Sequence, residues 1–261
     1  MKRVFTLVMC AASLAGGARA AEPECLAYTP AFTTALVELY TSEGCESCPP
    51  ADHWLSSLFG EGFRPDQVVP LALHVDYWDY VGWKDPYAKA EFSRRQYKLA
   101  RMRRAAVVYT PQVVVQGQDF RRWNSDDFAR TVERINSTPA RARIRLTLQS
   151  MTKDAATVGV VAQLLDPVER GRAALYLAAY ENRLASDVRA GENRGRRLEH
   201  DFVVREWIGP IAFDRDLKIE EKRSLPLLPN AVPSHSGVAA FVQDRSSGDV
   251  LQALMLPACS G

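Results

Sequence analysis

The first half of the chain alternates between strand-like and helix-like patterns of apolar residues. Residues 35–41 are apolar and rich in strand formers, and residues 68–75 form a near-continuous apolar run. Such a run is typical of a strand that is buried on both faces of a parallel or mixed sheet. Between them, after Pro49, apolar side chains recur at helical spacing and predict one apolar helix face. These side chains are Ala51, Trp54, Leu55 and Leu58.

The same alternation continues with two more helices around a short strand. We predict helices over about 87–104 and 125–136 and a strand over 112–115, with 120–123 pairing back onto that strand. The first of these helices has an apolar inward face, formed by Phe92, Leu99 and Met102. Its outer face is basic and is predicted to be solvated, with Arg94, Arg95, Lys98, Arg101, Arg103 and Arg104. Strands alternating with helices predict an α/β layered domain over residues 21–138.

The second half shows strand-like patterns, separated by polar turns. The predicted strands are 142–148, 154–165, 173–181, 198–207, 216–223, 237–243 and 249–256. The polar segment 182–199 is predicted to be a long loop. Short strands at regular spacing predict an all-β, sandwich-like domain over residues 139–261.

The first twenty residues have the pattern of a secretory signal peptide. Two basic residues precede the apolar stretch 4–15, and residues 18–20 read Ala-Arg-Ala, which suits a cleavage site. The alternative is a lipoprotein signal anchored through Cys10. We expect residues 1–20 to be removed and the mature protein to be secreted or periplasmic.

Composition and charge exclude several classes of protein. The 261 residues are 47% apolar and 25% charged, with 15 Gly and 15 Pro, so the chain is neither collagen-like nor broadly disordered. The net charge of +2 lacks the basic excess of a nucleic-acid binder. No later apolar run reaches the ~18 residues of a membrane span, so we expect no stable membrane insertion.

Four cysteines remain after the predicted cleavage, and their spacing divides them into two pairs. Cys25 and Cys259 lie at the two ends of the mature chain. Export favours disulfides, and chain ends are often close in space, so we predict a structural disulfide between these two. Free thiols are the alternative. Closing so long a loop stabilises a fold by about 5 kcal/mol in the chain-entropy treatment.

Cys45 and Cys48 form a C-x-x-C at the predicted start of a helix. The helix dipole and its free N–H groups stabilise an anion there, which lowers the pKa of the first thiol. Cys45 would be the nucleophile, and Cys48, one turn further, would close the disulfide with it. A static structural disulfide is one alternative. Another is a Cu(I) or Zn(II) site, with His74 as a third ligand beside the two cysteines.

Longer motifs around this pair carry a family resemblance. Residues 38–52 read ELYTSEGCESCPPAD, residues 74–86 read HVDYWDYVGWKDP, and residues 109–112 read YTPQ. Together with GENRG at 191–195, they resemble a family of secreted, thioredoxin-like bacterial proteins whose function is not established. The resemblance covers most of the mature chain. It implies an α/β thioredoxin-like domain followed by the all-β domain.

The resemblance also implies roles for individual residues. Pro111 would be the cis-proline beside the dithiol, and Glu38, on the strand before the motif, would accept the proton of the buried thiol. Glu46 and Ser47 stand where a reductant of this type has Gly-Pro, so general reductase activity is not implied.

The leading hypothesis is an exported thiol–disulfide oxidoreductase. Its partners would be exported protein thiols or disulfides and a redox protein that regenerates it, and no cofactor is expected. Thr110, Tyr77, Trp78 and Trp83 would contact substrate near the dithiol, although the aromatic residues can instead pack the crossover against the sheet. The alternatives are a periplasmic Cu or Zn chaperone and a non-catalytic binding protein that uses the same cysteines.

Overall fold

The structure is a computed structural model that describes residues 25–227 and 231–259. The predicted signal peptide, residues 1–20, and Cys10 lie outside this part. The described chain is rich in strands, which form several sheets, and carries fewer helices. None of the described helices combines the length and the apolar character needed to cross a bilayer.

The described part of the first half contains three α-helices and one 3-10 helix. They are α1 (Pro49–Ser57), α2 (Ala90–Met102), α3 (Asp127–Asn136) and the 3-10 helix η1 (Asp76–Val81). The strands of the first half are β1 (Cys25–Tyr28), β2 (Ala35–Thr41), β3 (Val68–His74), β4 (Gln112–Val115) and β5 (Gln118–Asp119). The strands of the second half are β6 (Ala142–Met151), β7 (Ala155–Leu164), β8 (Ala173–Glu181), β9 (Leu184–Asp187), β10 (Arg197–His200), β11 (Val203–Ala212), β12 (Lys218–Pro226), β13 (Ser236–Asp244) and β14 (Val250–Pro257).

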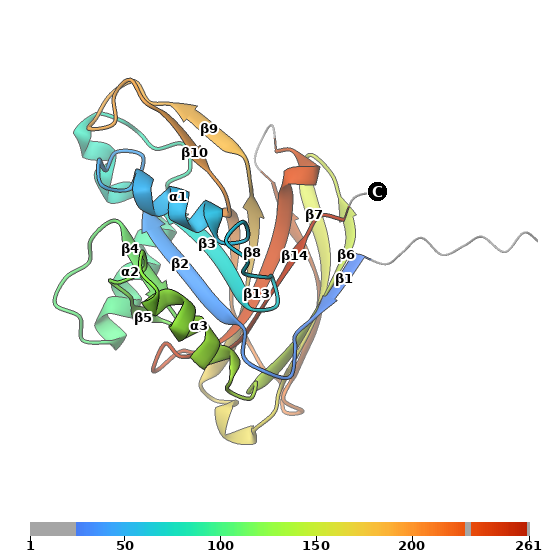
Figure 1. Cartoon of the computed structure of the whole chain (residues 1–261). Coiled ribbons are helices and arrows are strands. Elements are labelled where there is room, and N and C mark those ends of the chain that lie inside the picture. Colours follow the sequence, from blue (N-terminus) through green and yellow to red (C-terminus); the bar gives the residue numbers. More distant parts are fainter. Residues whose placement is uncertain (1–24, 228–230, 260–261) are drawn as a thin grey trace, which may run out of the picture.

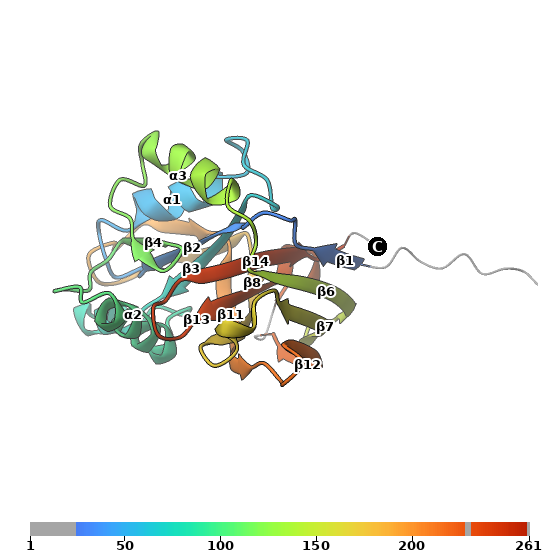
Figure 2. The same ribbon diagram turned by 90° about the horizontal axis from the view of Figure 1, so that it is seen from below.

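The largest sheet has eight strands in the order β14-β13-β8-β11-β3-β2-β4-β5. Strands β2 and β3 are parallel and wholly buried, and β4 runs antiparallel to β2. Helices α1 and α3 lie on one side of this part of the sheet and α2 lies on the other (Figure 2). The two apolar runs therefore became central strands between helical layers, as the pattern predicted.

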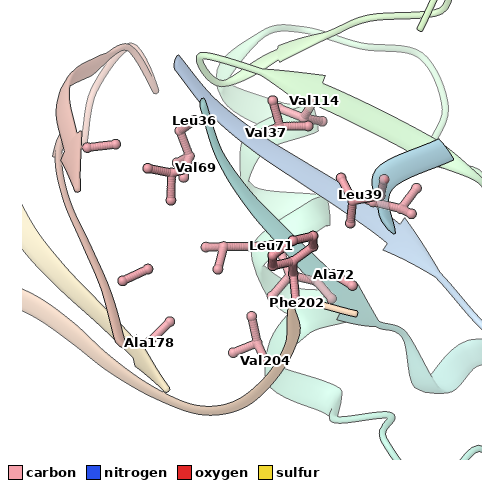
Figure 3. Packing of buried hydrophobic residues seen from close by; sticks show 14 of the residues in the cluster. Leu36, Val37, Leu39, Val69, Leu71, Ala72, Val114, Ala178, Phe202 and Val204 are labelled. Atoms are coloured by element: carbon pink, nitrogen blue, oxygen red, sulfur yellow. The ribbon is translucent and has the colours of Figure 1, made fainter. Parts of the chain in front are cut away.

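This sheet crosses the domain boundary that we predicted after residue 138. Strand β11 pairs in parallel with β3, where the N–H of Ala72 donates to the carbonyl of Phe202 over 2.8 Å. Phe202 and Val204 lie against Leu71 in the same buried cluster (Figure 3). Four strands of the second half thus extend the first-half sheet, and the two halves share one core.

A second sheet, in the order β1-β6-β7-β12, packs on the second-half strands. Strand β8 shows the arrangement, because its residues alternate between two apolar clusters. Tyr176 and Ala178 belong to the cluster shared with the first half, whereas Leu175 and Leu177 belong to the cluster between the sheets. β8 is consequently buried along its whole length.

Two local predictions were wrong in detail. The returning strand begins earlier than predicted, because Gln116 and Gly117 both have positive φ and make a tight turn that places residues 118–119 opposite β4. Phe120 extends the pairing, and its N–H donates to the carbonyl of Val113 over 2.8 Å. The polar segment 182–199 is not a simple loop. It contains the β9–β10 hairpin, which stands beside α1 (Figure 1).

The two ends of the described chain are tied together. A disulfide joins Cys25 in β1 to Cys259, which follows β14, with 5.7 Å between the two Cα atoms. Strand β1 itself pairs with β6 of the second half. The link therefore fastens the first strand to the end of the last one.

Candidate functional site

Cys45 and Cys48 are joined by a disulfide at the start of α1, directly after β2. A tight turn positions them, in which the N–H of Cys45 donates to the carbonyl of Ser42 and the N–H of Cys48 to that of Cys45. Prolines occupy the first two helical positions, where an N–H is not needed. The sequence therefore places both sulfur atoms at a helix N-terminus.

The disulfide lies under the surface of the molecule. Cys45 is 1% exposed and Cys48 is 0% exposed, whereas Glu46 and Ser47 between them are exposed. The predicted nucleophile is thus covered, and only the loop that carries it reaches solvent. Access to the sulfur atoms therefore depends on the segments that cover the disulfide.

One cover comes from the second half of the chain. Asn193, which is completely buried, donates its side-chain amide to the carbonyls of Glu43 and Cys45, each over 2.9 Å. The carboxylate of Glu192 accepts the N–H of Glu46 over 2.9 Å. Gly191 has φ +72° and leaves room for the η1 segment beside it. We call residues 191–193 the clasp.

The second cover is the segment of residues 76–86, which includes η1 and which we call the aromatic segment. The indole of Trp78 donates to the hydroxyl of Thr110 over 2.6 Å, and the indole of Trp83 donates to the carboxylate of Glu43 over 2.8 Å. The hydroxyl of Tyr77 donates to the side chain of Gln96 over 3.1 Å. The polar atoms of these predicted substrate contacts are therefore engaged within the protein, and they fasten the aromatic segment to the site.

Pro111 lies at the same end of the sheet as the disulfide. The peptide bond between Thr110 and Pro111 is cis. Strand β4 begins at the next residue, and its first residue, Gln112, pairs with Tyr40 near the end of β2. Because β2 leads directly into the C-x-x-C turn, this register brings the Thr110–Pro111 loop to that turn.

Glu38 does not fit the proton-acceptor role that we predicted for it. Arg95 of α2 binds both of its carboxylate oxygens, at 2.5 and 3.0 Å, and the hydroxyl of Tyr40 donates to it over 3.2 Å. Arg95 was itself predicted to be solvated, but only 10% of its side chain is exposed. Its guanidinium lies over three aromatic rings, with Trp207 the nearest at 4.6 Å. Glu38 therefore neutralises a buried arginine.

A different set of buried groups lies beside the disulfide. His74, at the end of β3, contacts Asp85 through Nδ1 over 2.7 Å. His200, at the end of β10, contacts Glu43 through Nε2 over 3.2 Å, and its Nδ1 lies 3.9 Å from Asp52 of α1. The two imidazole rings are 4.9 Å apart. Two histidines and three carboxylates from both halves of the chain thus form one polar cluster.

The cluster shifts the pKa values of its members in different directions. Burial alone would lower the pKa of His74, but the charge of Asp85 and the hydrogen bond to it raise it overall. Burial alone would raise the pKa of Asp85, but the charge of His74 and the hydrogen bond to it lower this pKa overall. Burial raises the pKa of Asp52, although the imidazoles of His200 and His74 oppose the rise. Burial therefore favours the protonated form of Asp52.

Asp52 lies one helical turn after Cys48. Side chains at i and i+4 share a helix face, with Cβ atoms about 5–6 Å apart. The N–H of Asp52 donates to the carbonyl of Cys48 over 3.1 Å, and both side chains are buried. Neither carboxylate oxygen of Asp52 has a hydrogen-bond partner among the described residues. The i, i+4 spacing was visible in the sequence, and it was the signal that could have identified this residue.

Cys45, Cys48 and His74, the residues of the alternative metal site, have other partners in this structure. Across residues 25–227 and 231–259, no group of three histidine, cysteine, aspartate or glutamate side chains is arranged to hold a metal ion. Cys45 and Cys48 are bonded to each other, and the Nδ1 of His74 faces Asp85.

Comparison with known proteins places the chain among structures of the same fold. A crystal structure of protein AGR_C_4864 from Agrobacterium tumefaciens is 24% identical and superposes with a TM-score of 0.60, covering 88% of this chain and 96% of that one. HBP35 of Porphyromonas gingivalis is 15% identical with a TM-score of 0.66, covering 89% and 79%. Among curated proteins, none matches this chain. Because residues 36–243 match the family described as "Protein of unknown function (DUF1223)", the chain belongs to that family.

Proposed function

We propose that this protein is an exported thiol–disulfide oxidoreductase of thioredoxin-like type, which exchanges disulfides with a protein partner through Cys45 and Cys48. The observation that carries the proposal is the disulfide at the N-terminus of α1, directly after a buried strand. A helix N-terminus stabilises the thiolate that this chemistry requires, both as attacking and as leaving group.

The arrangement of the first half supports a thioredoxin-like domain. Strands β3, β2, β4 and β5 lie in that order, with parallel pairing between the first two and antiparallel pairing after them. One helix follows β2, and another precedes β4. Pro111, before β4, and the C-x-x-C, after β2, share one end of this sheet.

The exchange runs through two displacements. A thiolate of the partner attacks the sulfur of Cys45, the Cys45–Cys48 bond breaks, and Cys48 leaves with the electron pair. A second thiolate of the partner then attacks the partner sulfur of the mixed disulfide, which gives a disulfide in the partner and releases Cys45 as a thiolate. The reverse sequence reduces a partner disulfide, and the relative reduction potentials set the direction.

Cys48 requires a proton when it leaves, and we assign this step to Asp52. Its pKa is raised by burial, so its carboxyl can hold a proton at a pH where an exposed aspartate has lost it. Its place one turn after Cys48 brings the proton to the correct sulfur. Glu38 cannot serve, because Arg95 holds both of its carboxylate oxygens.

The covered position of the disulfide adds a condition to this mechanism. Cys45 is almost completely buried, so a partner reaches it only after the clasp or the aromatic segment has moved. Opening therefore precedes the first displacement. Export fits this chemistry, because both disulfides persist in an oxidising compartment and the first twenty residues read as a signal peptide.

The test is the reduction potential of the Cys45–Cys48 pair. The mature protein is equilibrated with glutathione buffers, its free thiols are alkylated, and each cysteine is assigned by peptide mass. We expect a reversible two-electron transition at Cys45 and Cys48, while the Cys25–Cys259 disulfide in the same molecule stays intact as the control. A Cys45–Cys48 disulfide that also resists reduction, with a potential below about −300 mV, would identify a structural bridge and refute the proposal.

A further inference from the structure

A cleft of about 1000 Å³ opens beside the disulfide, between α1 and the β9–β10 hairpin. Its first wall begins at Glu46, between the two cysteines, and continues along α1 from Pro49 to Ser57. Its second wall is formed by every residue from Arg196 to Asp201, which includes the whole of β10. Figure 1 shows β10 alongside α1. A ligand in this cleft lies next to the loop that carries the disulfide.

The second wall presents the edge of a strand. β10 pairs with β9, and no strand covers its opposite edge in the described part of the chain. The N–H of Val188 donates to the carbonyl of Arg196, which sets the alternation of the antiparallel ladder. The backbone N–H and C=O groups of Leu198 and His200 therefore point toward β9. Those of Arg197 and Glu199 point the other way, toward the cleft. Such free N–H and C=O groups are what an added strand binds.

The innermost residues of the cleft carry buried polar atoms that have no hydrogen-bond partner among the described residues. Asp52 and His200 both line it, and they are 5% and 2% exposed. The Nε2 of His200 faces the carboxylate of Glu43, and its Nδ1 lies 3.9 Å from Asp52. Nδ1 and both oxygens of Asp52 have no hydrogen-bond partner among the described residues. A ligand that donates hydrogen bonds would satisfy the oxygens of Asp52.

The charges of the lining residues favour the same kind of ligand. Three carboxylates line the cleft against two guanidinium groups, and they belong to Glu46, Glu199 and Asp201. Asp52 adds a fourth negative charge once it has given up its proton. Both guanidinium groups already have partners in the protein, since Arg196 donates to Asn193 and Arg197 to Asp187. The cleft is therefore complementary to a cationic group.

We propose that this cleft binds an extended, basic segment of the partner polypeptide. The segment adds to the free edge of β10 as a third strand and directs a lysine or arginine side chain toward Asp52 and His200. This inference rests on the proposed function, because it names the substrate of the same site. A segment held along β10 lies beside Glu46, where its cysteine can reach the disulfide once the clasp opens.

The test measures docking without thiol chemistry. The probe is a fluorescein-labelled seven-residue peptide of alternating threonine and valine with a central lysine, and it contains no cysteine. Fluorescence anisotropy follows its binding to the mature protein with both disulfides intact. We expect saturable binding that weakens at least tenfold when the central lysine is replaced by glutamate.

A pair of variants tests the strand edge. Glu199→Pro and Glu199→Gln both remove the carboxylate, but only Glu199→Pro removes the N–H that faces the cleft. We expect Glu199→Pro to bind the peptide at least tenfold more weakly than Glu199→Gln. Should Glu199→Pro distort the hairpin, peptides that are N-methylated at alternate residues test the same edge on the wild-type protein. One of the two methylation registers should abolish binding.

The outcomes separate this inference from the proposed function. Any of three results would overturn the docking inference. They are an absence of saturable binding, an equal affinity for the lysine and glutamate peptides, and the lack of any difference both between the Glu199 variants and between the methylation registers. A normal redox transition without peptide binding would leave the oxidoreductase proposal standing alone. Peptide binding without a redox transition would support a polypeptide-binding cleft and refute the exchange chemistry.

Discussion

Removing the side-chain amide of Asn193 should expose the disulfide. This amide bridges the carbonyls of Glu43 and Cys45, at 2.9 Å each, and it is the buried anchor of the clasp. Asn193→Ala deletes these two hydrogen bonds to the C-x-x-C turn, and also the bond that Oδ1 accepts from Arg196, while keeping the backbone. The open form, in which solvent replaces the lost partners, then becomes more populated.

The size of the effect follows from the two contacts. A typical hydrogen bond contributes about 1 kcal/mol net, so their loss shifts the opening equilibrium by about 2 kcal/mol. Since about 1.4 kcal/mol corresponds to a factor of ten, the open population should rise about 30-fold.

The assay is the rate at which dithiothreitol reduces the Cys45–Cys48 disulfide. At low dithiothreitol concentration, opening and closing are fast compared with attack, and the rate is proportional to the open population. Alkylation and peptide mass follow the two cysteines separately from Cys25 and Cys259. We expect Asn193→Ala to be reduced about 30-fold faster than the wild type.

The chain offers a matched control in Asn136. Its side-chain amide also bridges two backbone carbonyls, those of Thr33 at 2.9 Å and Gln67 at 3.1 Å, far along the chain from the disulfide. Asn136→Ala should leave the reduction rate within about twofold of the wild type, because the clasp keeps both of its bonds. Equal acceleration in both variants would mean that reduction proceeds through general unfolding. A wild-type rate in Asn193→Ala would refute the role of the clasp.

Four further outcomes are expected. Asp52→Asn should slow reduction of the protein by a small thiol about 100-fold and flatten its pH dependence, because Cys48 loses its proton donor; an unchanged pH profile in stopped-flow kinetics would contradict this. Glu38→Gln should instead leave that rate within about threefold and lower the free energy of unfolding by about 3–5 kcal/mol, measured in urea, because a buried guanidinium loses its partner. Replacing Cys25 and Cys259 by serine should cost up to about 5 kcal/mol, or about 10–20 °C in Tm by calorimetry, and an unchanged Tm would show that the bridge does not constrain the chain. The pKa of His74 is raised in the folded protein, so its ion pair with Asp85 stabilises the fold fully below about pH 6.5, the unfolded pKa. This stabilisation is lost as the pH rises through the folded pKa. Urea titrations between about pH 6 and 9 should therefore show the free energy of unfolding falling in the wild type but not in His74→Gln.

Local pattern was sufficient to predict the central strands and the three α-helices of the first half, but not β1 or the position of β5. Strand β2 matches the predicted range of 35–41, and the helix after Pro49 begins where its spacing indicates. These features depend on neighbouring residues, whose apolar period and proline positions are written in the sequence. The β9–β10 hairpin was not predicted because its residues are mostly polar and lack a clear apolar period. Its contacts are with α1 and with Glu43, which follows β2.

The candidate site was predicted as far as the two cysteines and the Thr110–Pro111 loop. Glu38 was misassigned because position on a strand does not reveal which face a side chain takes in the folded sheet. Only the packing of α2 showed that Arg95 neutralises it. His200 and Asn193 could not be assigned from the sequence, since their partners Glu43 and Cys45 lie about 150 residues away. No periodicity encodes contacts of that separation.

These long-range contacts change the meaning of the second half. As a separate sandwich it would be an appendage to the first half. In the structure it supplies the carboxylate that accepts the N–H of Glu46, the amide that fastens Cys45, and the imidazole next to Asp52. It also covers the edge of β3, which would otherwise expose apolar residues and unpaired backbone groups. Burial raises the pKa of Asp52 only while this wall is in place, so the chemistry that we assign to the first half requires the second half to be folded against it.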